Sequence, residues 1–272
     1  MAYRGRFFVR QRIWCCGQFA EVELYPVFQP PGKRRSRCRP TKECQRRLNQ
    51  RASQMKLARL LRMNFAEGDL EIDLTYASPE SVEGAAADLR KFLRELRKIW
   101  RKAGEELRYI YTMEQGKKSG RVHFHLVLNQ GPLGRDELES LWGHGYANAR
   151  RLRMDENGVS GLAGYLSKQG RKRKPEDAGK RSWSCSRNLK RPEPEVRDGA
   201  VTVGDVMALA EEIDRRSAEA VMPDMTLVEA EAWRNQVNRG LYVRMEMAAP
   251  ECWHGRPPVP RYISGDLGED SA

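Results

Sequence analysis

The middle of the chain alternates between apolar and polar residues, which is the pattern of strands with one buried face. Residues 69–76 read D-L-E-I-D-L-T-Y, with an apolar side chain at every second position. The same period recurs over residues 107–115 and 121–129, and the sequence K-K-S-G at residues 117–120 between them is a turn signal. We therefore predict three strands here, the last two joined as a hairpin.

Other segments repeat their apolar residues at helical spacing. The strongest follows the first strand, where Ser78 and Pro79 supply an N-cap and a first-turn proline and the helix ends near Gly104. Strands and hairpins mixed with helices indicate an antiparallel sheet rather than a doubly wound one. We predict an α+β fold in which helices pack on a central antiparallel β-sheet. The other predicted elements are a hairpin within residues 6–28, helices from Thr41 and over 136–142, 159–169 and 203–217, and strands over 146–152 and 241–247.

Charge divides the 272 residues into segments. The chain carries 49 Lys and Arg against 37 Asp and Glu, a net charge of +12. Residues 1–64 have a net charge of +13 and residues 165–197 of +7, whereas residues 65–164 and 198–272 have −1 and −7. Grouped basic charge favours a polyphosphate partner, and a localisation signal or a solubilising run is the alternative. We divide the chain into a basic extension at 1–40, a central domain at 41–197 and an acidic helix–strand region at 198–272.

Apolar runs and cysteine spacing limit the class of protein. No run of 18 apolar residues is present, and arginines interrupt the apolar residues near the N-terminus. The sequence therefore predicts no membrane span and no signal peptide, and we expect a cytoplasmic protein. The six cysteines lack the C-x2-C spacing of structural zinc sites, and the chain is too long for a disulfide scaffold. Reduced, unligated thiols are the expected state.

Two of the four histidines lie in the predicted strand R-V-H-F-H-L-V-L-N. His123 and His125 share the face opposite Val122 and Phe124, because side chains alternate along a strand. Two imidazoles side by side can bind one ion, and a pair of exposed histidines on a sheet surface is the alternative.

The neighbouring strand adds a carboxylate if the hairpin loop is residues 117–120. Gly116 would then pair with Arg121, and Glu114 would lie opposite His123 with Cβ atoms about 5 Å apart. A slip of one residue would turn Glu114 to the other face. Two imidazoles and one carboxylate suit Mg²⁺ or Mn²⁺ and leave positions for substrate oxygens.

Tyr165 and Lys168 are neighbours on the predicted helix over residues 159–169, because they are three positions apart. A tyrosine can act as a covalent nucleophile, and a nearby ammonium or metal ion favours its phenolate. Packing at the edge of the apolar stripe is the alternative for Tyr165.

Taken in chain order, these segments resemble the three motifs of HUH endonucleases, in which two histidines flank an apolar residue, here Phe124. The motifs are D-L-E-I-D-L-T-Y, then E-x8-H-F-H on a hairpin, then G-Y-L-S-K on a helix. The likeness extends over about residues 41–194, and W-S-C-S-R-N-L-K-R-P at residues 183–192 also resembles a family segment. It is greatest to rolling-circle replication initiator (Rep) proteins of plasmids and phages and to replication-associated proteins of bacterial mobile elements. It implies a Rep nuclease-like fold for residues 41–197.

The resemblance also implies an activity: a metal-dependent endonuclease that nicks and transfers a DNA strand to initiate rolling-circle replication. Tyr165 would form a 5′-phosphotyrosine link and leave a free 3′-OH, and Lys168 would orient the DNA or steady the charge near the phenolate. His123, His125 and Glu114 would bind Mg²⁺ or Mn²⁺. The implied partner is single-stranded or hairpin origin DNA. No G-x4-G-K-[ST] motif is present, so unwinding would require a host helicase.

Two features depart from the family pattern. Asp73 stands where the first motif usually has a hydroxyl or apolar residue, and we interpret it as a solvent-facing charge rather than an acidic group near the metal. A single tyrosine at the helix position implies that a second protomer or a water molecule completes a round of replication. The oligomeric state is left open.

Basic side chains would hold DNA phosphates around the nick, which makes binding strongly salt-dependent. Trp183 would stack an unpaired base, and core packing is an equal alternative. The predicted DNA-binding residues are Arg34, Arg35, Arg37, Arg39, Arg171, Lys172, Arg173, Lys174, Arg181, Trp183 and Arg187.

Three other functions fit parts of the pattern. A single-tyrosine transposase or a relaxase would use the same metal and tyrosine chemistry on different DNA. A non-catalytic single-strand binding protein would share the fold but form no covalent adduct with DNA. A two-histidine, one-carboxylate iron oxygenase has similar ligands, but their usual spacing differs and a chain of charge +12 is an unusual host.

Overall fold

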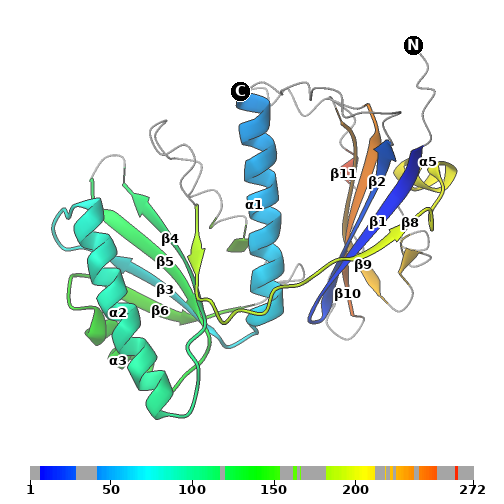
Figure 1. The fold of residues 1–272 in the computed structure, drawn as a ribbon. Coiled ribbons are helices and arrows are strands. Elements are labelled where there is room, and N and C mark those ends of the chain that lie inside the picture. Colours follow the sequence, from blue (N-terminus) through cyan, green and yellow to red (C-terminus); the bar gives the residue numbers. More distant parts are fainter. Residues whose placement is uncertain are drawn as a thin grey trace. The chain divides into compact units, whose positions relative to one another are not determined.

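The computed structural model divides the chain into two compact units, residues 51–191 and residues 1–50 together with 192–272 (Figure 1). The structure describes residues 7–28, 42–116, 120–153, 162–163, 166, 182–211, 218, 221–222, 225–235, 239–249 and 261–262, with backbone alone at 42–47 and 261–262.

The unit of residues 51–191 is built on a five-stranded sheet in the order β6-β3-β5-β4-β7, with every pair of neighbours antiparallel. Strand β5, which carries the two histidines, is central. The predicted α+β class and the predicted strands of this segment are confirmed, with ends shifted by one or two residues. The strands are β3 (Leu70–Thr75), β4 (Tyr109–Gln115), β5 (Val122–Leu128), β6 (Ala147–Arg151) and β7 (Ser184–Cys185).

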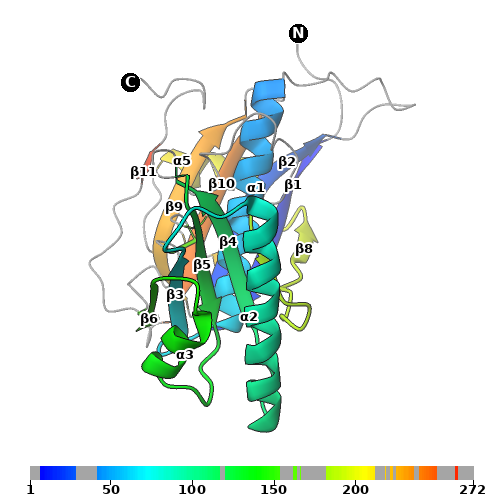
Figure 2. The same cartoon turned by 90° about the vertical axis from the view of Figure 1, so that its left-hand side faces the viewer.

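Helices α2 (Val82–Lys102) and α3 (Arg135–Trp142) cover one face of this sheet (Figure 2). Their apolar side chains share one core with alternate residues of β3 and β5, among them Ile72, Leu74 and Phe124, which are all buried. Burial of this apolar surface holds the two helices on the sheet.

The start of α2 differs from the prediction, which placed the N-cap at Ser78. The helix begins at Val82, and Ser81 is its N-cap: the Ser81 hydroxyl accepts a hydrogen bond from the N–H of Gly84 at 3.0 Å. This bond satisfies one of the N–H groups that the first turn leaves free, which Ser78 is too far away to do.

The opposite face of the sheet is covered in part by α1 (Lys42–Asn64). Leu57 and Leu61 of this helix are buried with Ile110 of β4 and Val127 of β5. Val127 follows His125 on the same face of β5, because alternate side chains of a strand point the same way. The two histidines therefore lie on the α1 face of the sheet, and α2 lies on the other.

The second unit contains a six-stranded sheet in the order β11-β9-β10-β2-β1-β8. The predicted N-terminal hairpin is confirmed as β1 and β2, and the predicted late strand as β10. Strand β2 pairs with β10, so the sequence segments 1–40 and 198–272 contribute strands to one sheet. The elements are β1 (Phe7–Cys16), β2 (Phe19–Phe28), β8 (Glu195–Asp198), α5 (Val203–Glu211), β9 (Thr226–Arg234), β10 (Leu241–Ala248) and β11 (Arg261–Tyr262).

A buried ion cluster joins β2 and β10 in this second sheet. The Arg244 guanidinium donates to Glu21 at 2.9 Å and also contacts Glu246, and all three residues are buried. Such a cluster stabilises the native pairing mainly because a charge left without its partner in this position would be costly. Among the described residues, no helix is both long and apolar enough to cross a membrane.

Leu96 provides a test of the α2 packing, because its side chain is completely buried between the helix and the sheet. We expect Leu96→Ala to lower the free energy of unfolding by about 2–5 kcal/mol, through lost apolar burial and the cavity left behind. Urea unfolding followed by circular dichroism measures the change. The exposed Lys102→Ala on the same helix is the control and should change stability by less than about 0.5 kcal/mol. Equal effects of the two substitutions would contradict this packing.

Candidate functional site

The β4–β5 hairpin has the register that the sequence predicted. The N–H of Gly116 donates to the carbonyl of Arg121 at 2.9 Å, which closes the loop at the expected place. Glu114 pairs with His123 across the two strands, so it lies on the same face as both histidines. This face of β5 therefore brings two imidazoles and one carboxylate into the same region.

His125 is flanked on its other side by Asp73 of β3, its direct partner in the sheet. The Asp73 carboxylate lies 2.5 Å from Nδ1 of His125, and the histidine side chain is 12% exposed. The interpretation of Asp73 as a solvent-facing charge is therefore wrong, because antiparallel pairing of β3 with β5 turns it toward the imidazole. A carboxylate at Nδ1 fixes the orientation of a ring and leaves Nε2 for a ligand.

Arg150 of β6 holds Asp73 from the opposite side. Its guanidinium donates to Asp73 at 2.9 Å and to both carboxylate oxygens of Glu71 at 2.6 and 3.0 Å. Three adjacent strands thus supply the chain Arg150–Asp73–His125. Arg150 was not among the predicted site residues, and its one signal in the sequence was its place in the predicted strand over residues 146–152.

Thr112 of β4 is the partner of His125 on the side away from Asp73. Its side chain is buried, and its hydroxyl has no hydrogen-bond partner among the described residues. A buried hydroxyl without a partner is costly, so a group that binds next to His125 would find an unused donor and acceptor there.

Burial and neighbouring charges set the protonation of the site. Burial by itself raises the pKa of Asp73, but the hydrogen bond and charge of His125, together with Arg150, outweigh it and hold that pKa below its usual range. Burial, and then the charge of His125, lower the pKa of His123. His123 is therefore neutral near pH 7, which is the form that binds a metal ion.

The donor atoms fit a divalent cation in part. His123 and His125 supply neutral nitrogen ligands on one face, and Asp73 orients the second ring as carboxylates do behind metal-binding histidines. Within the described residues, no three His, Cys, Asp or Glu side chains are gathered closely enough to hold a metal ion. Glu114 is placed on the correct face by its register but is not gathered with the histidines.

Tyr165 and Lys168 lie outside the described residues, so their positions stay predictions. The described helical residues on either side of Tyr165 are Ala163 and Leu166, and both are buried. They belong to the core cluster that contains Val127 of β5. The segment that carries the predicted nucleophile is therefore anchored on the histidine face of the sheet.

Most of the predicted DNA-binding residues also lie outside the described residues; Trp183 and Arg187 are described. Trp183 is partly buried, and its indole N–H donates to the Ser53 hydroxyl at 3.0 Å, so packing accounts for at least one edge of the ring. Arg187 is exposed. The residues outside the description are Arg34, Arg35, Arg37, Arg39, Arg171, Lys172, Arg173, Lys174 and Arg181.

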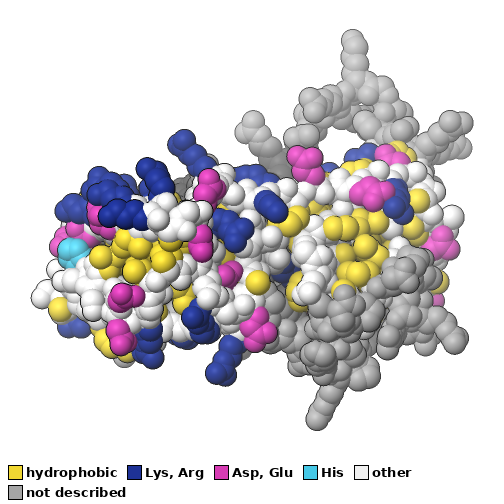
Figure 3. Space-filling view, turned by 90° about the horizontal axis from the view of Figure 1, so that it is seen from below, with side chains coloured by type: hydrophobic (Ala, Val, Ile, Leu, Met, Phe, Trp, Pro, Cys, Tyr) yellow, Lys and Arg dark blue, Asp and Glu magenta, His cyan; other side chains and the backbone are white. Residues whose placement is uncertain are grey.

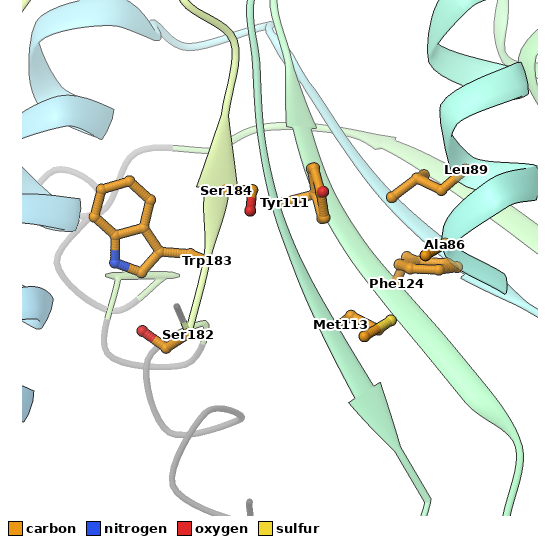
Figure 4. A pocket seen from close by; sticks show the side chains of 8 residues that line it. All are labelled: Ala86, Leu89, Tyr111, Met113, Phe124, Ser182, Trp183 and Ser184. Atoms are coloured by element: carbon orange, nitrogen blue, oxygen red, sulfur yellow. The ribbon is translucent and has the colours of Figure 1, made fainter. Parts of the chain in front are cut away.

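Trp183 also borders a pocket of about 110 Å³ next to strands β4 and β7 (Figure 4). The pocket is mostly apolar, with three hydroxyl-bearing side chains. Neither histidine lines it, so it is separate from the candidate metal ligands. Its lining is Ala86, Leu89, Tyr111, Met113, Phe124, Ser182, Trp183 and Ser184.

Residues 70–170 match a protein family described as replication-associated protein, of the ORF2 group. The matched segment begins at β3 and contains Asp73, both histidines, Glu114 and Tyr165. No curated protein and no solved structure matches the chain. The family match supports a role in replication for this segment.

The protonation of His123 can be tested directly. In the presence of EDTA we expect its imidazole to titrate below about pH 6.5, because burial and the charge of His125 disfavour the protonated form. Since its pKa is lower in the folded protein than in the unfolded chain, its contribution to stability decreases as the pH falls below about 6.5. NMR titration of the ring resonances measures the midpoint, and His125→Ala should raise it. A midpoint at or above about 6.5 would rule out the described environment.

Proposed function

We propose that this chain is a metal-dependent endonuclease that nicks and transfers a DNA strand to initiate rolling-circle replication. The observation that carries the proposal is the Asp73–His125 contact beside His123 on the central strand. It supports a histidine pair oriented for ligand binding rather than two unrelated surface imidazoles. The match of residues 70–170 to a replication-associated family directs the proposal to replication.

In the proposed reaction, Tyr165 is the nucleophile. Its phenolic oxygen forms a bond to the phosphorus of a DNA phosphodiester, and the bond from that phosphorus to the 3′-oxygen breaks. The phenol loses its proton, and the departing 3′-oxygen gains one, which leaves a 3′-OH and a 5′-phosphotyrosine. Lys168 would stabilise negative charge near the phenolate. Because the covalent link retains the phosphodiester bond energy, the strand can be rejoined without ATP.

His123 and His125 would hold Mg²⁺ or Mn²⁺, with Glu114 as the third ligand. When bound, the cation would polarise a phosphate oxygen and neutralise charge on it. Asp73 would keep the His125 ring in one orientation, and Arg150 would hold Asp73 in turn. These two residues are positioning residues in the proposal, because neither would touch the DNA or the ion.

The partner is proposed to be single-stranded or hairpin origin DNA, with a host helicase for unwinding. A transposase or relaxase would use the same residues, but the family match favours the replication initiator. A binding protein without catalysis is separated from both by the absence of a covalent adduct.

The nucleophile is tested by Tyr165→Phe. We expect the native chain, incubated with Mn²⁺ and a labelled single-stranded origin oligonucleotide, to form a covalent adduct. The phenylalanine variant should form none, because it lacks the attacking oxygen, while its DNA binding stays within about twofold. Denaturing gels detect the adduct, and mass spectrometry of the digested complex locates it. An adduct on Tyr109, Tyr111 or Tyr146 would overturn the assignment, and binding without any adduct would favour the non-catalytic alternative.

The positioning role of Asp73 is tested by Asp73→Asn. We expect this variant to bind Mn²⁺ about 10–100-fold more weakly, because the His125 ring loses the carboxylate that orients it. Isothermal titration calorimetry measures the affinity. Glu71→Gln is the matched control, since Glu71 lies on the same strand and binds Arg150 but pairs with Val127 in the sheet. Equal losses in the two variants would mean that general charge near the site, rather than the Asp73–His125 contact, sets the affinity.

A further inference from the structure

Helix α2 carries a concentration of positive charge on the side of the sheet away from the histidines. Residues 90–102 contain seven Lys and Arg and one acidic residue, Glu95, and all seven basic residues are exposed. The rest of residues 65–164 carries eight Lys and Arg against 15 Asp and Glu. The basic charge of this segment is therefore gathered on one helix instead of being spread evenly. Figure 3 shows Lys and Arg side chains grouped on the surface of the left-hand unit.

Four of these residues form a straight stripe, which we call the arginine stripe: Arg90, Arg94, Arg97 and Arg101. Their spacings of four, three and four residues keep them on one face of the helix. At 1.5 Å per residue the stripe is about 16 Å long. The inner face of α2 is buried in the sheet core through Phe92, Leu96 and Trp100, so the stripe lies on the outer surface of the helix.

The charges of the stripe are not neutralised inside the described part of the molecule. The side chains of Arg90, Arg94 and Arg101 have no hydrogen-bond or ion-pair partner among the described residues. Arg97 donates to the neutral Tyr109 hydroxyl at 3.0 Å, which positions the guanidinium without removing its charge. The carboxylate of Glu95 is bound to Lys98, beside the stripe. Arginines held in line in this way match a linear array of negative groups.

We propose that the arginine stripe of α2 binds the phosphate backbone of double-stranded DNA. About 16 Å corresponds to roughly five phosphates along one strand of a duplex, at about 3.4 Å per nucleotide of that strand. Along α2, which the structure describes in full, no aromatic side chain is exposed, because Phe92 and Trp100 are buried. The helix therefore lacks the stacking groups of single-strand binders, and it has no apolar face left to insert into a membrane.

This surface is distinct from the candidate nicking site, because α2 and the histidines lie on opposite faces of the sheet. A hairpin origin has a duplex stem next to unpaired bases, so the two faces would contact different parts of one DNA molecule. The choice of DNA as the polyanion rests on the family match and the proposed function, whereas the stripe itself requires no nicking chemistry.

The test compares triple variants in duplex binding, measured by fluorescence anisotropy from about 50 to 300 mM salt in EDTA. For Arg90→Gln, Arg94→Gln and Arg101→Gln together, we expect the slope of log K against log salt to become shallower by about 3, because three phosphate contacts are lost. The corresponding lysine variant should keep the native slope. Arg153→Gln, Arg234→Gln and Arg239→Gln together remove the same charge from exposed sites elsewhere and should leave the slope unchanged.

Equal slopes for the glutamine and control variants would overturn the proposal, as would an equal loss on single-stranded and double-stranded DNA. Loss of binding to phosphatidylserine vesicles with duplex binding intact would also overturn it, in favour of a membrane surface. Adduct formation by the glutamine variant on a single-stranded oligonucleotide should persist. A failure of the stripe is therefore distinguishable from a failure of the Tyr165 mechanism, which the adduct assay measures.

Discussion

The alternation of side chains along β5 is the constraint on which both functional surfaces depend. Val122, Phe124 and Leu126 point to one side and pack the sheet against α2, so His123 and His125 must point to the other. A slip of one residue in this strand would bury the imidazoles and expose the core. The hydrophobic effect that holds α2 on the sheet therefore also presents the histidines.

Pairing then converts two imidazoles on a sheet face into an ordered site. β3 supplies Asp73 on one side of His125, and β6 supplies Arg150 behind it. The aspartate is stabilised as a carboxylate by both neighbours, despite its burial. Polar networks of this kind keep a single side-chain arrangement because each group satisfies the next, and ligand sites benefit from such prior ordering.

The two faces of the sheet offer different chemistry to the proposed DNA partner. One face presents nitrogen and oxygen ligands with a helical segment anchored beside them. The other presents a helix whose outer side is rich in cationic side chains. Reaction at one phosphodiester requires atomic precision, whereas holding a duplex requires distributed charge, and the sheet keeps these two demands apart.

Local patterns were sufficient to predict the strands of the central segment and the β4–β5 register, because these depend on period-two alternation and a short turn. The same patterns placed Glu114 opposite His123. The contact of Asp73 with His125 was decided only by the tertiary structure, because α2 and β4 separate β3 from β5 along the chain and their pairing depends on the topology of the whole sheet. Strand β9 was missed since its alternation of alanine with glutamate has little β-propensity, and pairing with β10 stabilises it instead.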